Sequence, residues 1–447
     1  MSAAITTQPI LPNSYVIRGG RVIDPGNRLD QSADVAVVDG RIHRIGRELT
    51  VDHPSIDATG LLVCPGLIDI HVHFREPGGE HKETIETGCA SAAAGGFTTV
   101  ACMPNTNPAI DSPTVLDLIR EKSRRAGLCR VLPIAAATEA RRGLKPVDMT
   151  ALKGRGAVAF SDDGDGIEDD AVMLRALEQV AAVGSVFIQH CEFKSISAGG
   201  VVHHGRVAEA LGVPGYDPRA ESAMLERDIG LVRRTGARYH VAHVSAAESV
   251  ELVRRAKSDG LPVTAEVCPH HLALTADACL EWGANAKMSP PLRDAADVRA
   301  CIDGLCDGAI DCIVTDHAPH TVDEKARGMR DAPCGIVGLE TALAIVSDTL
   351  IQPQRLDWPA VIALFTTAPA RVLGIAGGNL GVGQPADIVL VDPSMTWRID
   401  VSRFASKCRN TPFDGWNVTG RPIVTILDGR LTYVAPGVTQ RLETAAR

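Results

Sequence analysis

The sequence predicts an α/β protein, a (β/α)8 TIM-type barrel that carries a small β domain formed by both chain termini. Three observations favour this fold. The chain has 447 residues, too many for one small domain. Its middle alternates short apolar runs with helical patterns, as βα units do, and β-rich segments lie at both ends. We therefore expect residues 1–64 and 376–447 to form the β domain, and residues 65–375 to form the barrel.

The two ends of the chain share a pattern of short apolar strands and tight turns. Asp39-Gly40 and Asp428-Gly429 are dipeptides that typically join antiparallel strands. The predicted strands are Tyr15–Arg18, Gly20–Ile23 and Asp34–Val38 in the first segment, and Ala386–Asp392, Pro422–Leu427 and Arg430–Val434 in the last. Two β-rich ends around a long α/β middle indicate one sheet built from both.

The middle of the chain contains eight candidate strands separated by candidate helices. The strands are the run that ends at His71, then Phe97–Cys102, Val131–Ala137, Ala157–Ser161, Ser185–Gln189, Tyr239–Val244, Pro262–Val267 and Ala309–Thr315. The clearest helices are Ser112–Ala126, Asp170–Val183, Ala220–Thr235, Ala246–Ser258 and Ala295–Cys306. Eight such units favour a closed barrel, and a doubly wound sheet is the alternative. Two segments, Ser197–Pro214 and Thr321–Gly335, are long for connecting loops and are typical of functional loops.

Composition excludes several classes of protein. Hydrophobic residues make up 45% and charged residues 22%, the balance of a globular protein. The formal net charge is -9 and no Lys/Arg-rich run occurs, so we expect no nucleic-acid partner. No apolar run approaches a membrane span, and the N-terminus lacks the pattern of a signal peptide. The twelve cysteines are scattered without a Cys-x-x-Cys, which predicts buried thiols in the cytoplasm.

The strand that ends in His71-Val72-His73-Phe74-Arg75 carries the strongest chemical signal. Alternate residues of a strand point to the same face, so His71 and His73 should project together, with Arg75 following on that side. Neutral imidazole is a common ligand of zinc. The pattern predicts a metal site with an anion-binding arginine beside it.

Further potential ligands recur where other predicted strands end. They are Asp162, Asp163, His190, His243 and Asp316. In a barrel these carboxyl ends form one face, where the active site lies. Each residue also has a plain structural interpretation: a core histidine, an Asx turn at Asp162 or Asp163, or a helix cap at Asp316. The pair His270-His271 we assign to structural roles.

The number of ligands restricts the chemistry. Four histidines with one or two carboxylates exceed the needs of one tetrahedral zinc and fit a two-metal centre with a bridging carboxylate. Such a centre suits hydrolysis of a C–N bond. Hydride or phosphoryl transfer is disfavoured, because no Gly-x-Gly-x-x-Gly opens a helix and no Gly-Lys-Ser/Thr loop occurs.

Taken together, these segments resemble the dihydroorotase family of the amidohydrolase superfamily. The matching segments, in family order, are Asp69–Gly78, Met103–Thr106, Asp162–Gly164, His190–Glu192, His243–Ser245, Pro269–Leu272 and Asp316–His320. The resemblance runs from about residue 15 to residue 435. It implies the barrel and the composite β domain, and it implies zinc, one or two ions per subunit with two favoured.

The resemblance also implies roles for the ligands. His71 and His73 would hold one metal, His190 and His243 the second, and Asp316 would touch the first metal and act as the catalytic acid/base. Many amidohydrolases bridge the metals with a carboxylated lysine, but the fourth predicted strand contains none, and Lys153 lies before it. The type with an aspartate in this role matches better. Alignment on His190 places that role on Asp163, with the adjacent Asp162 as the alternative.

Substrate contacts follow from the same resemblance. Arg75 would bind the substrate carboxylate as a bidentate pair, helped by Asn105 and His320. Thr321–Gly335 would lie beside the site, ending in the expected contacts Pro333, Cys334 and Gly335. The family usually has Asn-Pro-Pro-Leu-Arg where this chain has Ser289-Pro290-Pro291-Leu292-Arg293. Serine lacks the paired donor and acceptor of the amide, so the contact from Ser289 to the substrate ring is an open question.

The expected activity is the reversible cyclisation of N-carbamoyl-L-aspartate to L-dihydroorotate in de novo pyrimidine synthesis. A metal-bound hydroxide would attack the ring carbonyl while Asp316 transfers the proton. Two alternatives remain at this point: another cyclic amidase resembling allantoinase or dihydropyrimidinase, and an inactive subunit that scaffolds aspartate carbamoyltransferase. We expect a homo-oligomer, with a complex with aspartate carbamoyltransferase as a further option, and no membrane partner.

Overall fold

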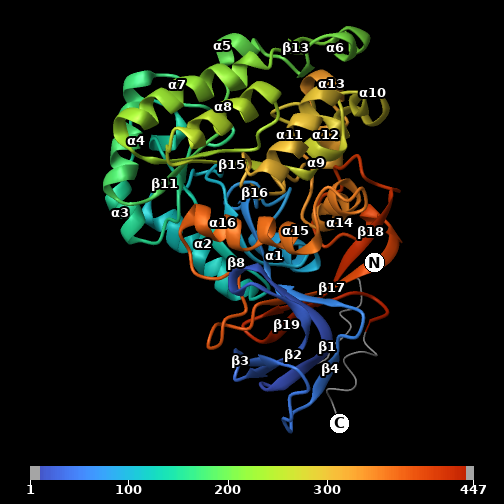
Figure 1. The fold of residues 1–447 in the computed structure, drawn as a ribbon. Coiled ribbons are helices and arrows are strands. Elements are labelled where there is room, and N and C mark those ends of the chain that lie inside the picture. Colours follow the sequence, from blue (N-terminus) through green and yellow to red (C-terminus); the bar gives the residue numbers. More distant parts are fainter. Residues whose placement is uncertain (1–10, 439–447) are drawn as a thin grey trace.

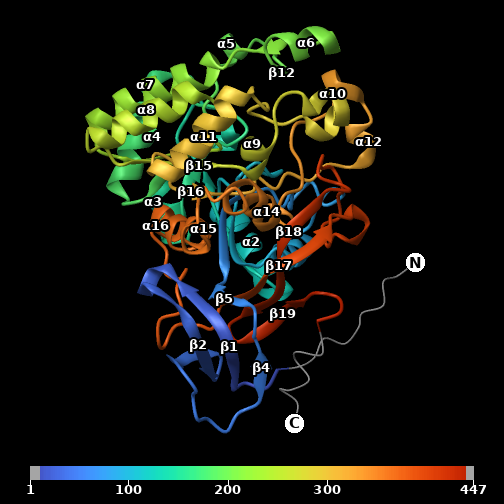
Figure 2. The ribbon, with the colours of Figure 1, turned by 45° about the vertical axis from the view of Figure 1, so that its right-hand side comes forward.

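The computed structural model describes residues 11–438. Figure 1 shows a strand-rich unit below a larger unit whose strands are surrounded by helices. The lower unit combines the start of the chain, in blue, with its end, in red, and the view in Figure 2 shows the same arrangement. Segments that lie more than 300 residues apart in sequence are thus neighbours in one sheet.

The composite sheet runs in the order β19-β18-β17-β5-β1-β2-β3, and β4 pairs with β1. Its strands are β1 Tyr15–Asp24, β2 Leu29–Val38, β3 Arg41–Gly46, β4 Ser55–Asp57, β5 Leu62–Pro65, β17 Ile388–Arg398, β18 Asn417–Leu427 and β19 Arg430–Val434. The two chain ends meet where β5 pairs antiparallel with β17, from Ile388 opposite Pro65 to Val391 opposite Leu62. The sheet therefore contains strands from both predicted segments, although the exact domain boundaries remain a prediction.

The upper unit is a ring of parallel strands. They are β6 Leu67–Val72, β7 Phe97–Cys102, β8 Arg130–Pro133 with β9 Ala135–Ala136, β10 Phe160–Ser161, β11 Val186–Gln189, β14 Arg238–Val241, β15 Val263–Val267 and β16 Cys312–Ile313. The ring is closed by a parallel bridge from Val72 to His317, just beyond β16. The doubly wound alternative is wrong, because an open sheet would leave β6 and β16 apart.

Helices surround this ring on its outside and also lie above it, as Figure 1 shows. They are α1 Ile85–Ala94, α2 Pro113–Ala126, α3 Met149–Gly154, α4 Asp170–Ala182, α5 Lys194–Ser197, α6 Arg206–Leu211, α7 Arg219–Thr235, α8 Ala247–Ser258, α9 Pro269–Ala273, α10 Ala278–Trp282, α11 Ala295–Asp307, α12 Val322–Lys325, α13 Gly328–Asp331, α14 Ala342–Val346, α15 Trp358–Phe365 and α16 Thr367–Leu373. Two short strands, β12 Val202–His203 within the first long segment and β13 Gly215–Tyr216 just after it, pair with each other. Neither predicted long loop is featureless, since the second holds α12 and α13.

The barrel and the composite sheet share a core. Apolar residues of β17 alternate between two clusters: Ile388 and Leu390 pack with the sheet's own core, and Val389 and Val391 pack with the core of the barrel. A separate cluster takes one or two residues from most barrel strands, an arrangement that only the interior of the barrel permits. The strand ends that carry the predicted ligands are consequently supported by packed side chains from several directions.

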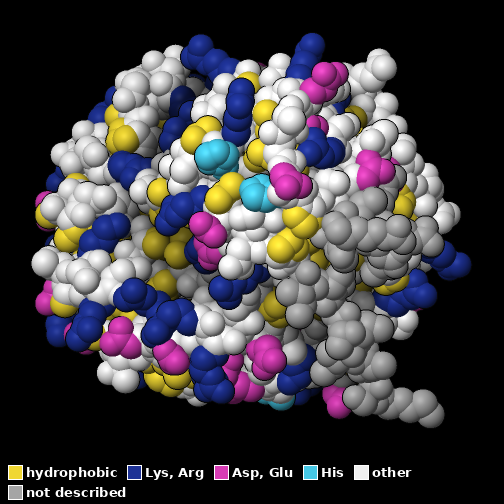
Figure 3. All heavy atoms as spheres, turned by 90° about the horizontal axis from the view of Figure 1, so that it is seen from below, with side chains coloured by type: hydrophobic (Ala, Val, Ile, Leu, Met, Phe, Trp, Pro, Cys, Tyr) yellow, Lys and Arg dark blue, Asp and Glu magenta, His cyan; other side chains and the backbone are white. Residues whose placement is uncertain are grey.

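Membrane-spanning helices, cysteine pairing and surface charge can each be described for residues 11–438. None of its helices combines the length and apolar character needed to cross a membrane. All twelve cysteines lie in this part and none is paired, and ten of them are buried. Seen from below, basic side chains are interspersed with acidic ones on this face and do not form one patch (Figure 3).

Candidate metal centre and active site

Four histidines and one aspartate converge at the carboxyl ends of the barrel strands. His71, His73 and Asp163 form one group of potential ligands, and Asp163, His190 and His243 form a second, with the ligand atoms of each group within 4.8 Å of one another. All five side chains are buried. Because both groups contain Asp163, they are adjacent and share a carboxylate.

Asp163 lies at the centre of this cluster. Its Oδ1 is 3.4 Å from Nε2 of His71 and 3.5 Å from Nε2 of His243, while its Oδ2 is 3.5 Å from Nε2 of His73. Oδ1 also lies 3.8 Å from Nδ1 of His190. One carboxylate therefore faces all four rings.

The neighbouring Asp162 points elsewhere. Its Oδ1 accepts hydrogen bonds from the backbone N–H groups of Ala137, at 2.9 Å, and Thr138, at 3.0 Å. Its Oδ2 accepts the hydroxyl of Thr138. Asp162 joins the ends of two neighbouring strands, and this leaves Asp163 as the carboxylate that faces the histidines.

Asp316 follows the last barrel strand and completes the cluster. Its Oδ1 lies 2.9 Å from Nε2 of His73 and 3.6 Å from Nε2 of His71. Asp316 has φ 47° and His243 has φ 31°, so both adopt a left-handed backbone that costs energy outside glycine. Strain of this kind is found where packing forces a side chain into a functional position.

The donor set fits metal cations. His71 Nε2 and Asp163 Oδ1 are buried and have no hydrogen-bond partner among the described residues. His190 Nδ1 and His243 Nε2 face each other at 3.0 Å, a contact that two unprotonated nitrogens avoid unless a cation or proton lies between them. Burial opposes ionisation of Asp163, but His71 and its other histidine neighbours hold its pKa well below the usual range. Imidazole and carboxylate ligands of this kind are typical of zinc.

A second carboxylate fixes the orientation of His71. Glu266 in β15 is fully buried, and its Oε1 lies 2.5 Å from Nδ1 of His71. A carboxylate accepts, so Nδ1 carries the proton and Nε2 offers its lone pair to the site. Nε2 of His240 contacts the other oxygen of Glu266 at 3.0 Å, and Nδ1 of His240 contacts the Thr264 hydroxyl at 2.7 Å.

The sequence alone assigns no role to Glu266 or His240. The available signal was a charged residue inside an apolar run, Pro262–Val267, that reads as a fully buried strand. Such a residue is rarely left unpaired. Its partner could not be identified, because His71 lies 195 residues away.

The predicted substrate contacts border one cavity of about 320 Å³ beside the cluster. Its lining includes Arg75, Asn105, Ser289, His320, Cys334 and Gly335 together with five of the six predicted ligands: His73, Asp163, His190, His243 and Asp316. Pro333 does not line this cavity in the described structure. Its carbonyl oxygen instead accepts a hydrogen bond from Nζ of Lys325 at 2.8 Å. His71 is also outside the lining, beneath the floor of the cavity, and is fully buried.

Arg75 reaches the cavity by a different route from the predicted one. Strand β6 ends at Val72, and Arg75 has φ 61°. The side chain of Arg75 therefore does not owe its position to the alternation of side chains along a strand. Its Nε donates to the carbonyl of Pro319 at 3.3 Å, and its Nη2 donates to Nε2 of His320 at 3.2 Å. His320 is therefore neutral and accepts this hydrogen bond. Burial and the nearby cation of Arg75 both lower the pKa of His320, which agrees with the neutral form.

Asn105 has two functions in this geometry. Its Oδ1 lies 2.8 Å from Nδ1 of His73 and accepts that proton, which leaves Nε2 of His73 facing the cluster. The amide nitrogen of Asn105 remains as a donor in the cavity wall. The residue thus orients a potential metal ligand and borders the cavity.

Known structures share this architecture. The chain superposes on the "L-Hydantoinase (Dihydropyrimidinase)" of Arthrobacter aurescens with a TM-score of 0.83 and 28% identity, over 94% of this chain and 96% of that one. A dihydropyrimidinase from Brevibacillus agri gives the same TM-score of 0.83 at 24% identity, which supports the fold alone. Fold and site together define a TIM-barrel cyclic amidohydrolase, and the predicted fold class is confirmed.

Curated relatives narrow the class to a family. Residues 60–249 match the family model described as "Dihydro-orotase-like". A dihydroorotase from Pelotomaculum thermopropionicum is 48% identical, over 93% of this chain and 97% of its own length. One from Citrifermentans bemidjiense is 44% identical, over 94% of this chain and its own full length. The chain belongs to the dihydroorotase family, and the predicted resemblance is confirmed.

Proposed function

We propose that this protein interconverts N-carbamoyl-L-aspartate and L-dihydroorotate, as a dihydroorotase of de novo pyrimidine synthesis. The observation that carries the proposal is the placement of Arg75 and His320 on one wall of a cavity whose floor holds the histidine and aspartate cluster. A guanidinium beside a hydrolytic centre suits a cyclic amide that bears a carboxylate.

Zinc is the proposed cofactor, with two ions favoured. His71, His73, Asp163 and Asp316 would hold one ion, and Asp163, His190 and His243 the other. Bound zinc lowers the pKa of water to about 7 and polarises a carbonyl oxygen. Asp163 is the proposed bridge, because its carboxylate alone faces both pairs of histidines.

Asp316 is the proposed acid/base. Burial opposes its ionisation, but the contact with His73 and the nearby His71 hold its pKa below the usual range, so the group is an ionised acceptor. In the hydrolytic direction, a C–O bond forms at the ring carbonyl and the ring C–N bond breaks. Asp316 accepts the proton that the water loses and delivers it to the leaving nitrogen. Ring closure follows the same path in reverse.

Arg75, Asn105 and His320 are the proposed carboxylate-binding group. The guanidinium of Arg75 is held by Pro319 and His320, so little side-chain freedom is lost when it binds an anion. Ser289 also borders the cavity, where its hydroxyl can meet the ring with one donor and one acceptor. Cys334 and Gly335 bring the end of the second long segment against the same space.

The other cyclic amidases remain the second candidate function, because structural relatives are named hydantoinase or dihydropyrimidinase. The position of Lys153 argues against this second candidate. Lys153 lies on α3, and its ammonium is near Arg238 at the start of β14, whereas the site lies beyond the opposite end of that strand. No described lysine is placed to take the role of a carboxylated bridge. An inactive scaffold is disfavoured because the potential ligands are all present.

The test is turnover of L-dihydroorotate, dihydrouracil, hydantoin and allantoin by the zinc-replete protein. We expect turnover of L-dihydroorotate alone or by a wide margin, and preference for a ring without a carboxylate would overturn the proposal. Asp316→Ala should retain folding and metal but lose about 10²- to 10⁴-fold in kcat, the usual contribution of an acid/base. Asp165→Ala, in the loop after the proposed bridge but half-exposed, is the matched control and should remain active.

The proposed partners beyond the substrate remain predictions. We propose a cytoplasmic homo-oligomer, with association with aspartate carbamoyltransferase as a further option. Light scattering of the purified protein, with and without that enzyme, tests both.

A further inference from the structure

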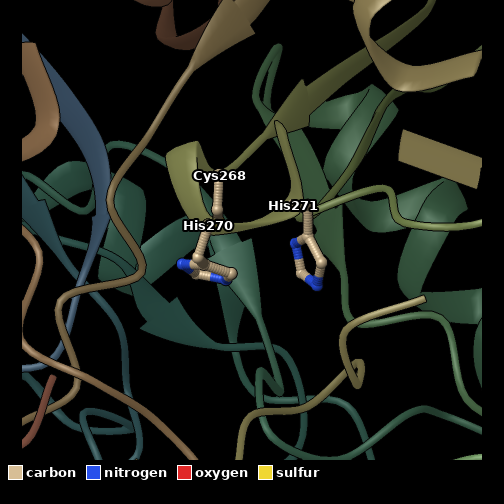
Figure 4. A group of neighbouring side chains, drawn as sticks. All are labelled: Cys268, His270 and His271. Atoms are coloured by element: carbon tan, nitrogen blue, oxygen red, sulfur yellow. The ribbon is translucent and has the colours of Figure 1, made fainter. Parts of the chain in front are cut away.

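A second group of potential ligands lies at the turn that follows β15. Cys268, His270 and His271 are each buried, and their ligand atoms lie within 4.8 Å of one another. Helix α9 begins at Pro269, so all three side chains leave the chain within a single turn. Figure 4 shows the two imidazole rings extending from this turn in the same direction. Their centroids are 4.4 Å apart.

The tautomer of His271 is determined by its neighbour. Its Nε2 lies 3.1 Å from the carbonyl oxygen of Pro290, and a carbonyl only accepts, so Nε2 carries the proton. Nδ1 therefore has a free lone pair. That atom is buried and has no hydrogen-bond partner among the described residues.

His270 presents the same anomaly. Its Nε2 is buried without a hydrogen-bond partner in the described part of the chain, although only 2% of the residue is exposed. An unpaired buried polar atom costs about 1–3 kcal/mol, and native proteins contain few of them. Here two such atoms lie in adjacent residues, beside the buried thiol of Cys268. This arrangement indicates a ligand that accepts lone pairs.

We propose that Cys268, His270 and His271 bind a transition-metal ion, separate from the catalytic centre. One sulfur and two imidazole nitrogens suit a borderline-soft ion such as zinc, with the thiol deprotonated on binding. The group itself contains no carboxylate, although Asp316 of the catalytic centre is near enough to act electrostatically on Cys268 and His270, and a sulfur and imidazole set disfavours calcium and magnesium. The site differs in ligand type from the catalytic centre, whose six proposed ligands are imidazoles and carboxylates.

The position of the site indicates what it does. His271 holds the carbonyl of Pro290, which follows Ser289 in the wall of the substrate cavity. An ion on Nδ1 of His271 fixes this ring to the end of β15 and so holds the Ser289 segment in place. The site is structural, with an effect on the substrate side of the cavity.

Cobalt(II) is the probe that distinguishes the two kinds of site. Metal-free full-length protein is titrated with cobalt(II), and ions bound per chain and the absorption spectrum are recorded. Coordination by sulfur gives a thiolate-to-cobalt charge-transfer band in the near ultraviolet, which imidazole and carboxylate ligands do not give. We expect that band to develop with one ion per chain in addition to those of the catalytic centre.

Cys268→Ser should abolish the band and lower the stoichiometry by one ion. Cys102→Ser is the matched control, because Cys102 is also a buried barrel thiol, at the end of β7, and belongs to no group of potential ligands in the described part of the chain, so the band should stay unchanged. Cys312→Ser should leave the band unchanged too, and its loss there would assign the band to Cys312 with His240 and Glu266. If Cys268→Ser does not fold, His270→Gln replaces it and should also lose the ion. Absence of a thiolate band in the wild type would overturn the proposal in favour of a buried water. A band that survives Cys268→Ser and His270→Gln would overturn it too, because another thiol would then bind the ion.

Discussion

At the scale of single residues, the site depends on pairs of side chains in which one partner determines which ring nitrogen of a histidine carries the proton. Glu266 determines the tautomer of His71, and Asn105 that of His73. Each partner leaves the opposite ring nitrogen free to bind metal. The ligands themselves were visible in the sequence, whereas these orienting partners depend on contacts between distant strands.

Glu266→Gln tests this idea directly. The glutamine keeps the size of the side chain but can turn its N–H2 toward His71 and favour the wrong tautomer. We expect zinc affinity to fall about 10- to 100-fold, as for other partners of metal-binding histidines. Competition with a chromophoric chelator measures it. The matched control is Glu221→Gln, a buried glutamate bound to Ser245 and Arg293, and equal losses in both variants would contradict a specific role.

Arg75 belongs to the same scale, since its proposed role is to select the substrate by charge. Arg75→Gln should lower kcat/KM for L-dihydroorotate about 30- to 150-fold, because a charged hydrogen-bonded pair contributes about 2–3 kcal/mol. The lower kcat/KM should come mainly from a higher KM. Turnover of dihydrouracil, which has no carboxylate, should be affected far less. A comparable loss for both rings would show that Arg75 supports the site without recognising the carboxylate.

At the scale of elements, the sequence predicted helices better than their connections. Helix α2 was expected over Ser112–Ala126 and is observed over Pro113–Ala126, because Pro113 suits its first turn and Gly127, with φ 63°, ends it. The strand expected over Val131–Ala137 is interrupted at Ile134. In the second long segment, Thr321 and Glu324 form a capping box that begins α12, and the Thr-x-x-Glu spacing in the sequence is the signal that could have predicted this helix.

That segment is held to the barrel by a buried lysine, and this predicts a pH effect. Lys325 in α12 donates from Nζ to the carbonyls of Pro333, at 2.8 Å, and Lys287, at 3.4 Å. Burial lowers its pKa from 10.5 to about 8. Since the folded value lies below the unfolded value, the contribution to stability is complete above about pH 10.5 and is lost as the pH falls through 8.

Lys325→Met removes this titration and keeps the length of the side chain. We compare the free energy of unfolding of the wild type with that of Lys325→Met. Between pH 7 and pH 10.5 this difference should change in favour of the wild type by about 3 kcal/mol at most. Urea denaturation at both pH values measures it. A difference that stays constant across this range would mean that Lys325 has an ordinary pKa.

At the scale of the whole molecule, the barrel and the composite sheet are joined through strands whose two faces serve different cores. In β5, Leu62 and Cys64 pack with the barrel core, while Val63 packs with the core of the sheet. β17 repeats this arrangement from the other end of the chain. Neither unit can lose its shared strands without exposing apolar surface of the other, so the two chain ends stabilise the platform under the active site.

This shared packing predicts that the protein unfolds in one transition, although a chain of 447 residues in two units would ordinarily show more than one. Leu390→Ala opens a cavity in the sheet core and should cost about 2–5 kcal/mol, while Val389→Ala faces the barrel core and should cost about 2 kcal/mol. Both should shift the same calorimetric peak at a fixed zinc concentration, since β17 belongs to both cores. Two peaks, of which Leu390→Ala moves only one, would show that the sheet unfolds independently. The composite sheet would then be an appended domain, and the site would owe its stability to the barrel alone.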